Sequence, residues 1–176
     1  MPLSMHSASA PVFVQMLSNM DAWLDKAAAH AEAKKFDTSV YLTLRLAPDM
    51  LPFPKQIQIA SDNAKGCVAR LAGVEIPKYE DNEASLAELK ARIAKTIDFV
   101  KSVPVESFAG AETRAIELPQ RNREPLRFDG ETYLKHFALP NFFFHVTTTY
   151  ALLRHNGVEL GKMDFLGALP QGGAAA

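Results

Sequence analysis

Cysteine is nearly absent from this sequence: Cys67 is the only one, and a lone thiol cannot form an internal disulfide. The N-terminus also lacks a basic segment followed by an apolar run and a small-residue cleavage site, which is the pattern of a secretory signal. Both absences favour a reducing, cytoplasmic setting.

The chain also has no large excess of positive or negative charge. The chain has 19 Lys and Arg against 20 Asp and Glu, which gives a formal net charge of -1. Nucleic-acid binding usually leaves a basic footprint on a protein. No nucleic-acid partner is therefore expected.

The sequence also lacks the short motifs that carry common chemistries. It has no HExxH, no CxxC, no acidic calcium loop, no glycine-rich phosphate loop and no nucleophile elbow. The stretch 137–153 has no Asp, Glu, Lys or Arg, but it is short for a membrane span and contains Asn, His and Thr. We expect this stretch to be a helix buried in protein, with no membrane partner.

The 176 residues, 48% of them hydrophobic, are typical of one globular domain with one core. We predict a single domain over residues 1–176, with its core from about 12 to 167. The small polar residues before Pro11 and the Gly- and Ala-rich end from 169 to 176 are expected to lie outside that core.

Apolar residues at steps of three and four predict three helices. The first covers 12–34, the second begins only after Pro54 and ends at Gly73, and the third begins near Leu86 and ends before Pro104. Charged residues off these apolar stripes, such as Lys65 and Arg92, are expected to be solvated.

A small β-hairpin is predicted within 112–128, because short alternating runs flank a polar turn at 119–125. A last helix is predicted over 131–156, either interrupted or kinked at Pro140. Helices of this length hide their stripes by packing together. The expected fold class is all-α, a four-helix bundle with a small β-hairpin inserted before the last helix.

The last helix carries the most informative polar residues. At 100° per residue, Asn141, His145 and Thr148 fall on one face. A water-exposed face would normally use Lys, Glu or Arg, so these side chains are expected to face the inside of the bundle or a subunit interface. Two interpretations stay open: a functional pocket, or plain hydrogen bonding between helices.

Three runs of residues resemble a bacterial family of domains of unknown function in the DinB/YfiT-like superfamily. They are ARLAGVEIP at 69–77, LPNFFFHVTTTYALLRHNGVELGK at 139–162 and DFLG at 164–167. The resemblance covers nearly the whole chain. It implies a DinB-like four-helix bundle that is often dimeric.

The resemblance also implies a site. Members of the superfamily commonly hold a divalent metal with three histidines, one on the second helix and two spaced HxxxH on the last. Here His145 matches the second histidine of that pair and Asn141 stands in place of the first. The second helix has no histidine, and Gln56 or Asp62 is its nearest polar substitute.

One imidazole with neutral amides is a poor site for Zn²⁺ or Ni²⁺. No cofactor is therefore expected, and at most a weakly bound divalent metal. We predict a homodimer whose pocket, lined by Gln56, Asp62, Asn141 and Thr148 around His145, binds a small molecule. The alternative is an enzyme, a metal-dependent hydrolase or thiol-dependent transferase, in which His145 is a general base or a single imidazole ligand.

Overall fold

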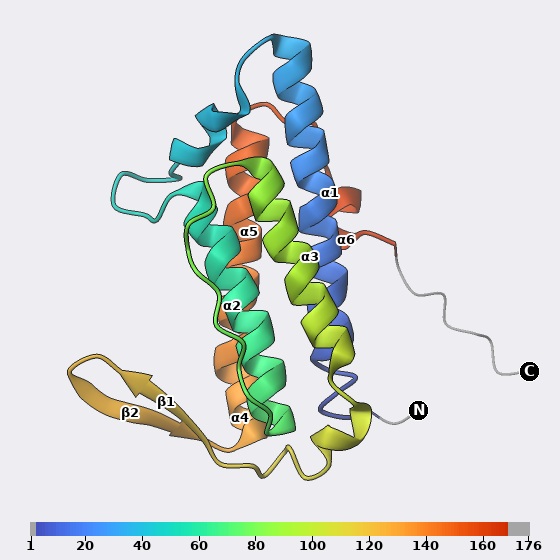
Figure 1. Cartoon of the computed structure of the whole chain (residues 1–176), viewed down its shortest axis with the longest axis vertical. Coiled ribbons are helices and arrows are strands. Elements are labelled where there is room, and N and C mark those ends of the chain that lie inside the picture. Colours follow the sequence, from blue (N-terminus) through green and yellow to red (C-terminus); the bar gives the residue numbers. More distant parts are fainter. Residues whose placement is uncertain (1–2, 169–176) are drawn as a thin grey trace, which may run out of the picture.

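Four long helices lie side by side and enclose the core of the molecule (Figure 1). The computed structural model describes residues 3–168. The helices are α1 (Ala10–Lys34), α2 (Phe53–Ala72), α3 (Leu86–Ser102) and α5 (Leu139–His155). α1 packs mainly on α3 and α5, and α2 packs on the same two helices. The predicted apolar stripes of α1, α2 and α3 form the buried faces.

The packed structure starts earlier than the predicted core boundary at Val12. Met5 and Ala8 pack against the core. Ser9 is fully buried, and its hydroxyl donates a hydrogen bond to the carbonyl of Met5 at 2.6 Å. Residues 5–9 form turns that fold back onto the first turn of α1. The apolar periodicity of the sequence does not predict these turns. The predicted loose C-terminal end, 169–176, lies outside the described residues.

Helix boundaries follow the capping residues closely. α2 begins at Phe53, so Pro54 lies inside its first turn, where its missing N–H has no helical partner to lose. It ends at Gly73, whose φ of 71° is the left-handed conformation of a C-terminal cap. At the start of α3 the hydroxyl of Ser85 accepts a hydrogen bond from the backbone N–H of Glu88 at 3.2 Å.

Three segments connect these helices. A 3₁₀ turn, η1 (Thr38–Thr43), follows α1, and another, η2 (Val105–Phe108), follows α3. Residues 74–85, which we name the strap, run without regular structure from the end of α2 back along α2 and α3 (Figure 1).

The predicted hairpin is present as β1 (Ile116–Gln120) and β2 (Arg123–Phe128), which pair antiparallel. Its turn is shorter than predicted, because Pro119 and Pro125 lie inside the strands. A sheet of two strands has only edge strands, where a missing N–H is tolerated. Asn122 in the turn adopts a φ of 61°.

The last long helix is built from three pieces of continuous helical backbone. α4 (Gly130–Tyr133) leads into a π-helical turn, η3 (Leu134–Ala138), and then into α5. The wide turn lies directly before Pro140, which cannot donate the usual i to i−4 hydrogen bond. Pro140 therefore begins a regular helix after a local widening.

A short helix near the C-terminus, α6 (Lys162–Leu166), was not predicted. It lies against α1, and three α1 side chains donate hydrogen bonds to its backbone carbonyls. The pairs are Gln15 to Leu166, Asn19 to Phe165 and Trp23 to Asp164, at 2.8, 2.9 and 3.0 Å.

The chain is thus mostly helical with one small antiparallel hairpin before the last long helix, as predicted. Within residues 3–168, no helix has the length and apolar character needed to cross a membrane.

Candidate functional site

His145 lies on the buried side of α5 and meets α2 through one hydrogen bond. Its Nδ1 lies 2.8 Å from Oε1 of Gln56. The amide of Gln56 is oriented by its own Nε2, which donates to the carbonyl of Leu51 at 2.8 Å. Because Oε1 can only accept, Nδ1 must carry the proton in this pair. The neutral imidazole then presents a lone pair at Nε2.

The surroundings of His145 favour that neutral form. Its side chain is only 8% exposed, and burial lowers its pKa below the ordinary 6.5. Nε2 has no hydrogen-bond partner among the described residues. It is a basic nitrogen that is not completely buried.

The ring of His145 is held on a fixed part of α5. The Phe144 ring meets it edge to face, with 5.2 Å between ring centroids. The hydroxyl of Thr149 donates to the carbonyl of His145 at 2.9 Å. The Thr149 bond involves only the backbone of His145, so the ring itself is positioned by Phe144 and Gln56.

Thr148 and Asn141 are the other predicted site residues on α5. The hydroxyl of Thr148 donates to the carbonyl of Phe144 at 2.8 Å, so its remaining capacity is as an acceptor. Asn141 is half-buried and lies one helical turn before His145.

Beside them is an open hollow of about 400 Å³ on the surface of α5. Its lining is mainly apolar: Leu46, Phe143, Phe144, Thr147, Thr148 and Ala151. Of the predicted site residues, only Thr148 belongs to this wall, and Phe144, which contacts the His145 ring, belongs to it too.

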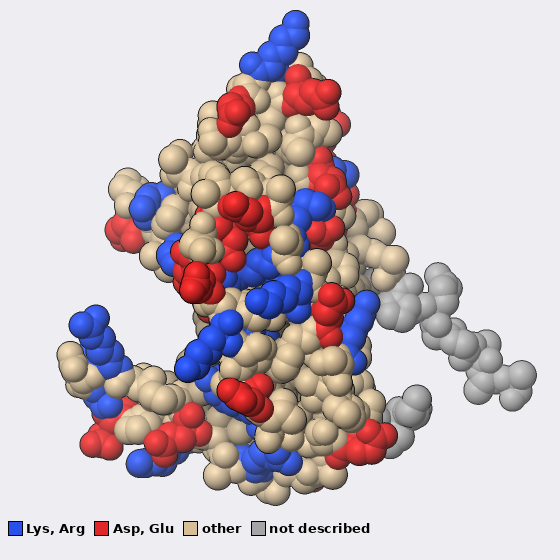
Figure 2. All heavy atoms as spheres, in the orientation of Figure 1, with Lys and Arg blue, Asp and Glu red and all other residues tan. Residues whose placement is uncertain are grey.

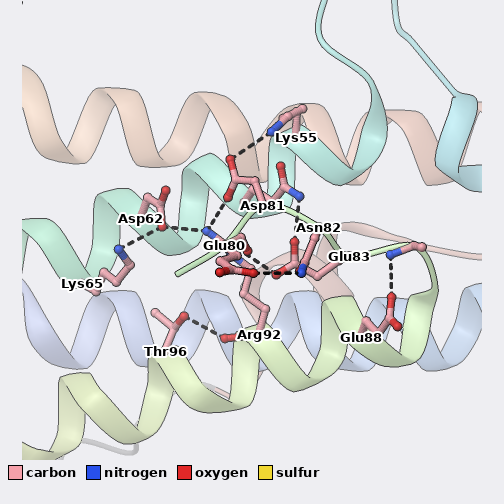
Figure 3. Close-up of polar contacts among 12 residues, drawn as sticks. Lys55, Asp62, Lys65, Glu80, Asp81, Asn82, Glu83, Glu88, Arg92 and Thr96 are labelled. Atoms are coloured by element: carbon pink, nitrogen blue, oxygen red, sulfur yellow. Dashed lines mark hydrogen bonds and ion pairs between the residues drawn. The ribbon is translucent and has the colours of Figure 1, made fainter. Parts of the chain in front are cut away.

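Asp62 does not join this group. Of the two predicted α2 residues, the structure brings Gln56 to His145 and turns Asp62 toward α3 and the strap (Figure 3). They are six positions apart on one helix, which is a rotation of about 240°. The Asp62 carboxylate lies 2.7 Å from Arg92 and 3.0 Å from Lys65.

Arg92 is the centre of a second polar cluster that the sequence pattern did not reveal. Only 4% of Arg92 is exposed, and its guanidinium pairs with Asp62, Asp81 and Glu83 at 2.7, 3.0 and 2.8 Å (Figure 3). Charged side chains of both signs gather across the middle of the face in Figure 2. The expectation that Arg92 and Lys65 are solvated is wrong, because the strap covers both.

Two of the carboxylates facing Arg92, those of Asp81 and Glu83, are stabilised in their charged form. Burial raises the pKa of Asp81 and Glu83, but hydrogen bonds from Lys55 to Asp81 and from Arg92 and Gln58 to Glu83 outweigh it. Both pKa values therefore lie below their ordinary 3.8 and 4.5. These ion pairs fasten the strap to α2 and α3.

The donor set around His145 does not fit a tightly bound metal. In the described part of the chain, no group of three or more His, Cys, Asp or Glu side chains is arranged to hold a metal ion. Gln56 supplies a neutral amide oxygen, which is already bonded to the imidazole. Cys67 is no alternative ligand or nucleophile here, because burial raises the pKa of its thiol.

The long helices with a small hairpin before the last of them define a mostly helical class of protein. The chain belongs to the family described as domain of unknown function DUF1993, whose model matches residues 5–166. It is similar to a DinB family member from Shewanella denitrificans, with 42% sequence identity, a TM-score of 0.87, and coverage of 96% of this chain and 95% of that one. The resemblance inferred from sequence is thereby confirmed. A comparison with curated proteins gave no match.

Proposed function

We propose that this protein is a DinB-like four-helix bundle that binds a small molecule at His145. The observation that carries the proposal is the hydrogen bond between Nδ1 of His145 and Gln56, which leaves Nε2 as an unprotonated acceptor. A ligand for this site needs a hydroxyl or thiol donor for Nε2 and an apolar part that fits the neighbouring hollow. Thr148 and Asn141 supply further polar contacts, and Asp62 is left out of the proposed site.

An enzymatic role is the alternative, and the lowered pKa of His145 favours it. A neutral imidazole fixed at one nitrogen by a partner is the arrangement of a general base. In that case Nε2 removes a proton from a hydroxyl or thiol of the substrate. As a single imidazole with amide neighbours, His145 supports at most weak binding of a divalent metal.

Binding can be tested with phenol, which combines an O–H donor with an apolar ring. We expect phenol to shift the amide resonances of residues 143–151 in a two-dimensional NMR titration, and toluene to shift them at least fivefold more weakly. His145→Gln should abolish this difference between the two compounds, whereas the matched variant His155→Gln at the exposed end of α5 should retain it. Equal binding of phenol and toluene to the unmodified protein would contradict the proposal.

We also propose a homodimer that packs through α5. The helix carries no charged side chain between 137 and 153, yet Phe144 is 55% exposed, and Pro140 and Thr147 are exposed with it. Leu46, 48% exposed, lines the same hollow as Phe144. An uncharged surface of this kind is what a second copy of the chain would cover, and a ligand in the hollow would then lie between the two copies. We also propose a cytoplasmic setting, which the single cysteine supports.

A further inference from the structure

A larger cavity lies at the other end of the last long helix. It measures about 710 Å³, within the range of small-ligand pockets. Three segments form it: the N-terminal turns at 3–8, the loop at 105–112 that includes η2, and residues 131–139 of α4, η3 and the start of α5 (Figure 1). Leu139 in its wall and His145 are six positions apart, on different sides of the helix. The cavity is therefore separate from the site at His145.

The inner wall of the cavity is apolar. Phe108 and Leu134 belong to the buried core, and Met5, Ala8 and Leu139 pack partly against it. These side chains come from all three segments, so the folding of the N-terminal turns completes the cavity. An apolar molecule of modest size gains free energy by covering such a wall.

The charged residues of the lining are mainly acidic. The lining contains three glutamates and one lysine: Glu106, Glu112, Glu131 and Lys135. Lys135 already bonds with Glu131 one helical turn away. For Glu106 and Glu112, no ion pair is found within the described part of the chain. Both are exposed and keep an uncompensated negative charge at the edge of the apolar wall.

We propose that this cavity binds a small organic cation with an apolar body, of the alkylammonium class. The ammonium group pairs with Glu106 and Glu112, and the hydrocarbon chain lies against Phe108, Leu134 and Leu139. An anion of the same shape is repelled by the same carboxylates, so charge gives the site its selectivity.

The test uses hexylammonium, with hexanoate and hexanol as probes of the same chain length. NMR titration of the full chain should show hexylammonium shifting the amides of residues 3–8, 105–112 and 131–139. We expect hexanol to bind at least fivefold more weakly than hexylammonium, and hexanoate at least tenfold more weakly. Binding of hexanol or hexanoate as tight as that of hexylammonium would overturn the proposal.

Variants separate this site from general surface binding. The double change Glu106→Gln with Glu112→Gln should weaken hexylammonium at least fivefold. The matched double change Glu75→Gln with Glu124→Gln, at exposed acidic positions outside the cavity, should leave the affinity unchanged. An equal effect of both pairs would show attraction to net charge alone and would overturn the proposal.

A filling variant tests the cavity without changing charge. Ala109 is an exposed lining residue, so Ala109→Trp should occupy the cavity and abolish hexylammonium binding while the thermal melt stays that of a folded protein. His145→Gln should leave hexylammonium binding intact, which distinguishes this site from the one under Proposed function. Unchanged affinity in folded Ala109→Trp would overturn the proposal.

Discussion

One polar neighbour on α2 fixes the tautomer of the His145 imidazole. Gln56 sets which nitrogen carries the proton, and burial sets the pKa below 6.5. The uncharged polar face of α5 predicted that His145 faces the inside of the bundle or a subunit interface, and in the structure it faces α2 inside the bundle. The sequence left Gln56 and Asp62 open as its partner. Gln56 lies nearer the edge of the apolar stripe of α2, whereas Asp62 points away from it, and the stripe alone does not show whether a second surface covers that side.

Replacing His145 separates the functional from the structural interpretation. His145→Ala leaves Gln56 without its partner and opens a cavity, so it should lower the free energy of unfolding by about 1–3 kcal/mol. His145→Gln keeps an N–H donor for Oε1 and a similar volume, and it should be close to the unmodified protein. Urea melts measure both. Equal, large losses would mean that the imidazole is a specific structural element, and the pocket should then be abandoned.

The metal prediction belongs to the same residues. After dialysis against a chelator, elemental analysis should find no stoichiometric Zn or Ni in the purified protein, because the site lacks a set of charged or imidazole ligands. Gln56→His together with Asn141→His restores the superfamily pattern and should raise Zn²⁺ affinity at least tenfold. About one Zn per chain in the unmodified protein would refute the prediction.

Among the elements, helices were more predictable than the segments between them. The stripes of α1, α2 and α3 follow the helical period, and Gly73 marks the end of α2 as predicted. The strap has no period, so its position over α2 and α3 could not be inferred. For this reason Lys65 and Arg92 were expected in water although the strap buries them.

The same limit applies to α6, because a helix of five residues shows too little periodicity to be recognised. Its place is set by tertiary hydrogen bonds from α1, such as the one from Trp23 to the Asp164 carbonyl. Such bonds join residues far apart in sequence, and no local pattern records them.

The strap depends on Arg92. Arg92→Met leaves three carboxylates facing one another and should lower stability by about 2–4 kcal/mol at pH 7, less than for a fully buried pair because Asp62 and Asp81 are partly solvated. Lys101→Met, at an exposed position of the same helix, should change little. Urea melts and hydrogen exchange of residues 74–85 report both effects.

This loss should also depend on pH. Asp81 and Glu83 have folded-state pKa values below their ordinary 3.8 and 4.5, so their contribution is complete above those values and disappears as pH falls through the folded-state values. The difference in stability between the unmodified protein and Arg92→Met should therefore shrink from pH 7 to pH 2.5. A difference independent of pH would show that the ion pairs do not fasten the strap.

At the scale of the whole molecule, the central prediction is self-association through α5. Light scattering at micromolar concentration should give twice the mass of the chain. Phe144→Glu places a charge on the exposed apolar surface and should give a folded monomer. The control variant Glu88→Gln, at an exposed position of α3, should stay dimeric. A monomer in the unmodified protein would contradict the proposed interface while leaving the site at His145 untouched.

The proposed site depends above all on an accessible, unprotonated Nε2 in His145. Two-dimensional NMR of ¹⁵N-labelled imidazoles measures this directly, with His145→Gln used to assign the signals. We predict a neutral ring at pH 7 with the proton on Nδ1, and a pKa below 6.5. Gln56→Leu should remove the preference for that tautomer. A proton on Nε2 at pH 7, or a ring that titrates at or above pH 6.5, would contradict the account.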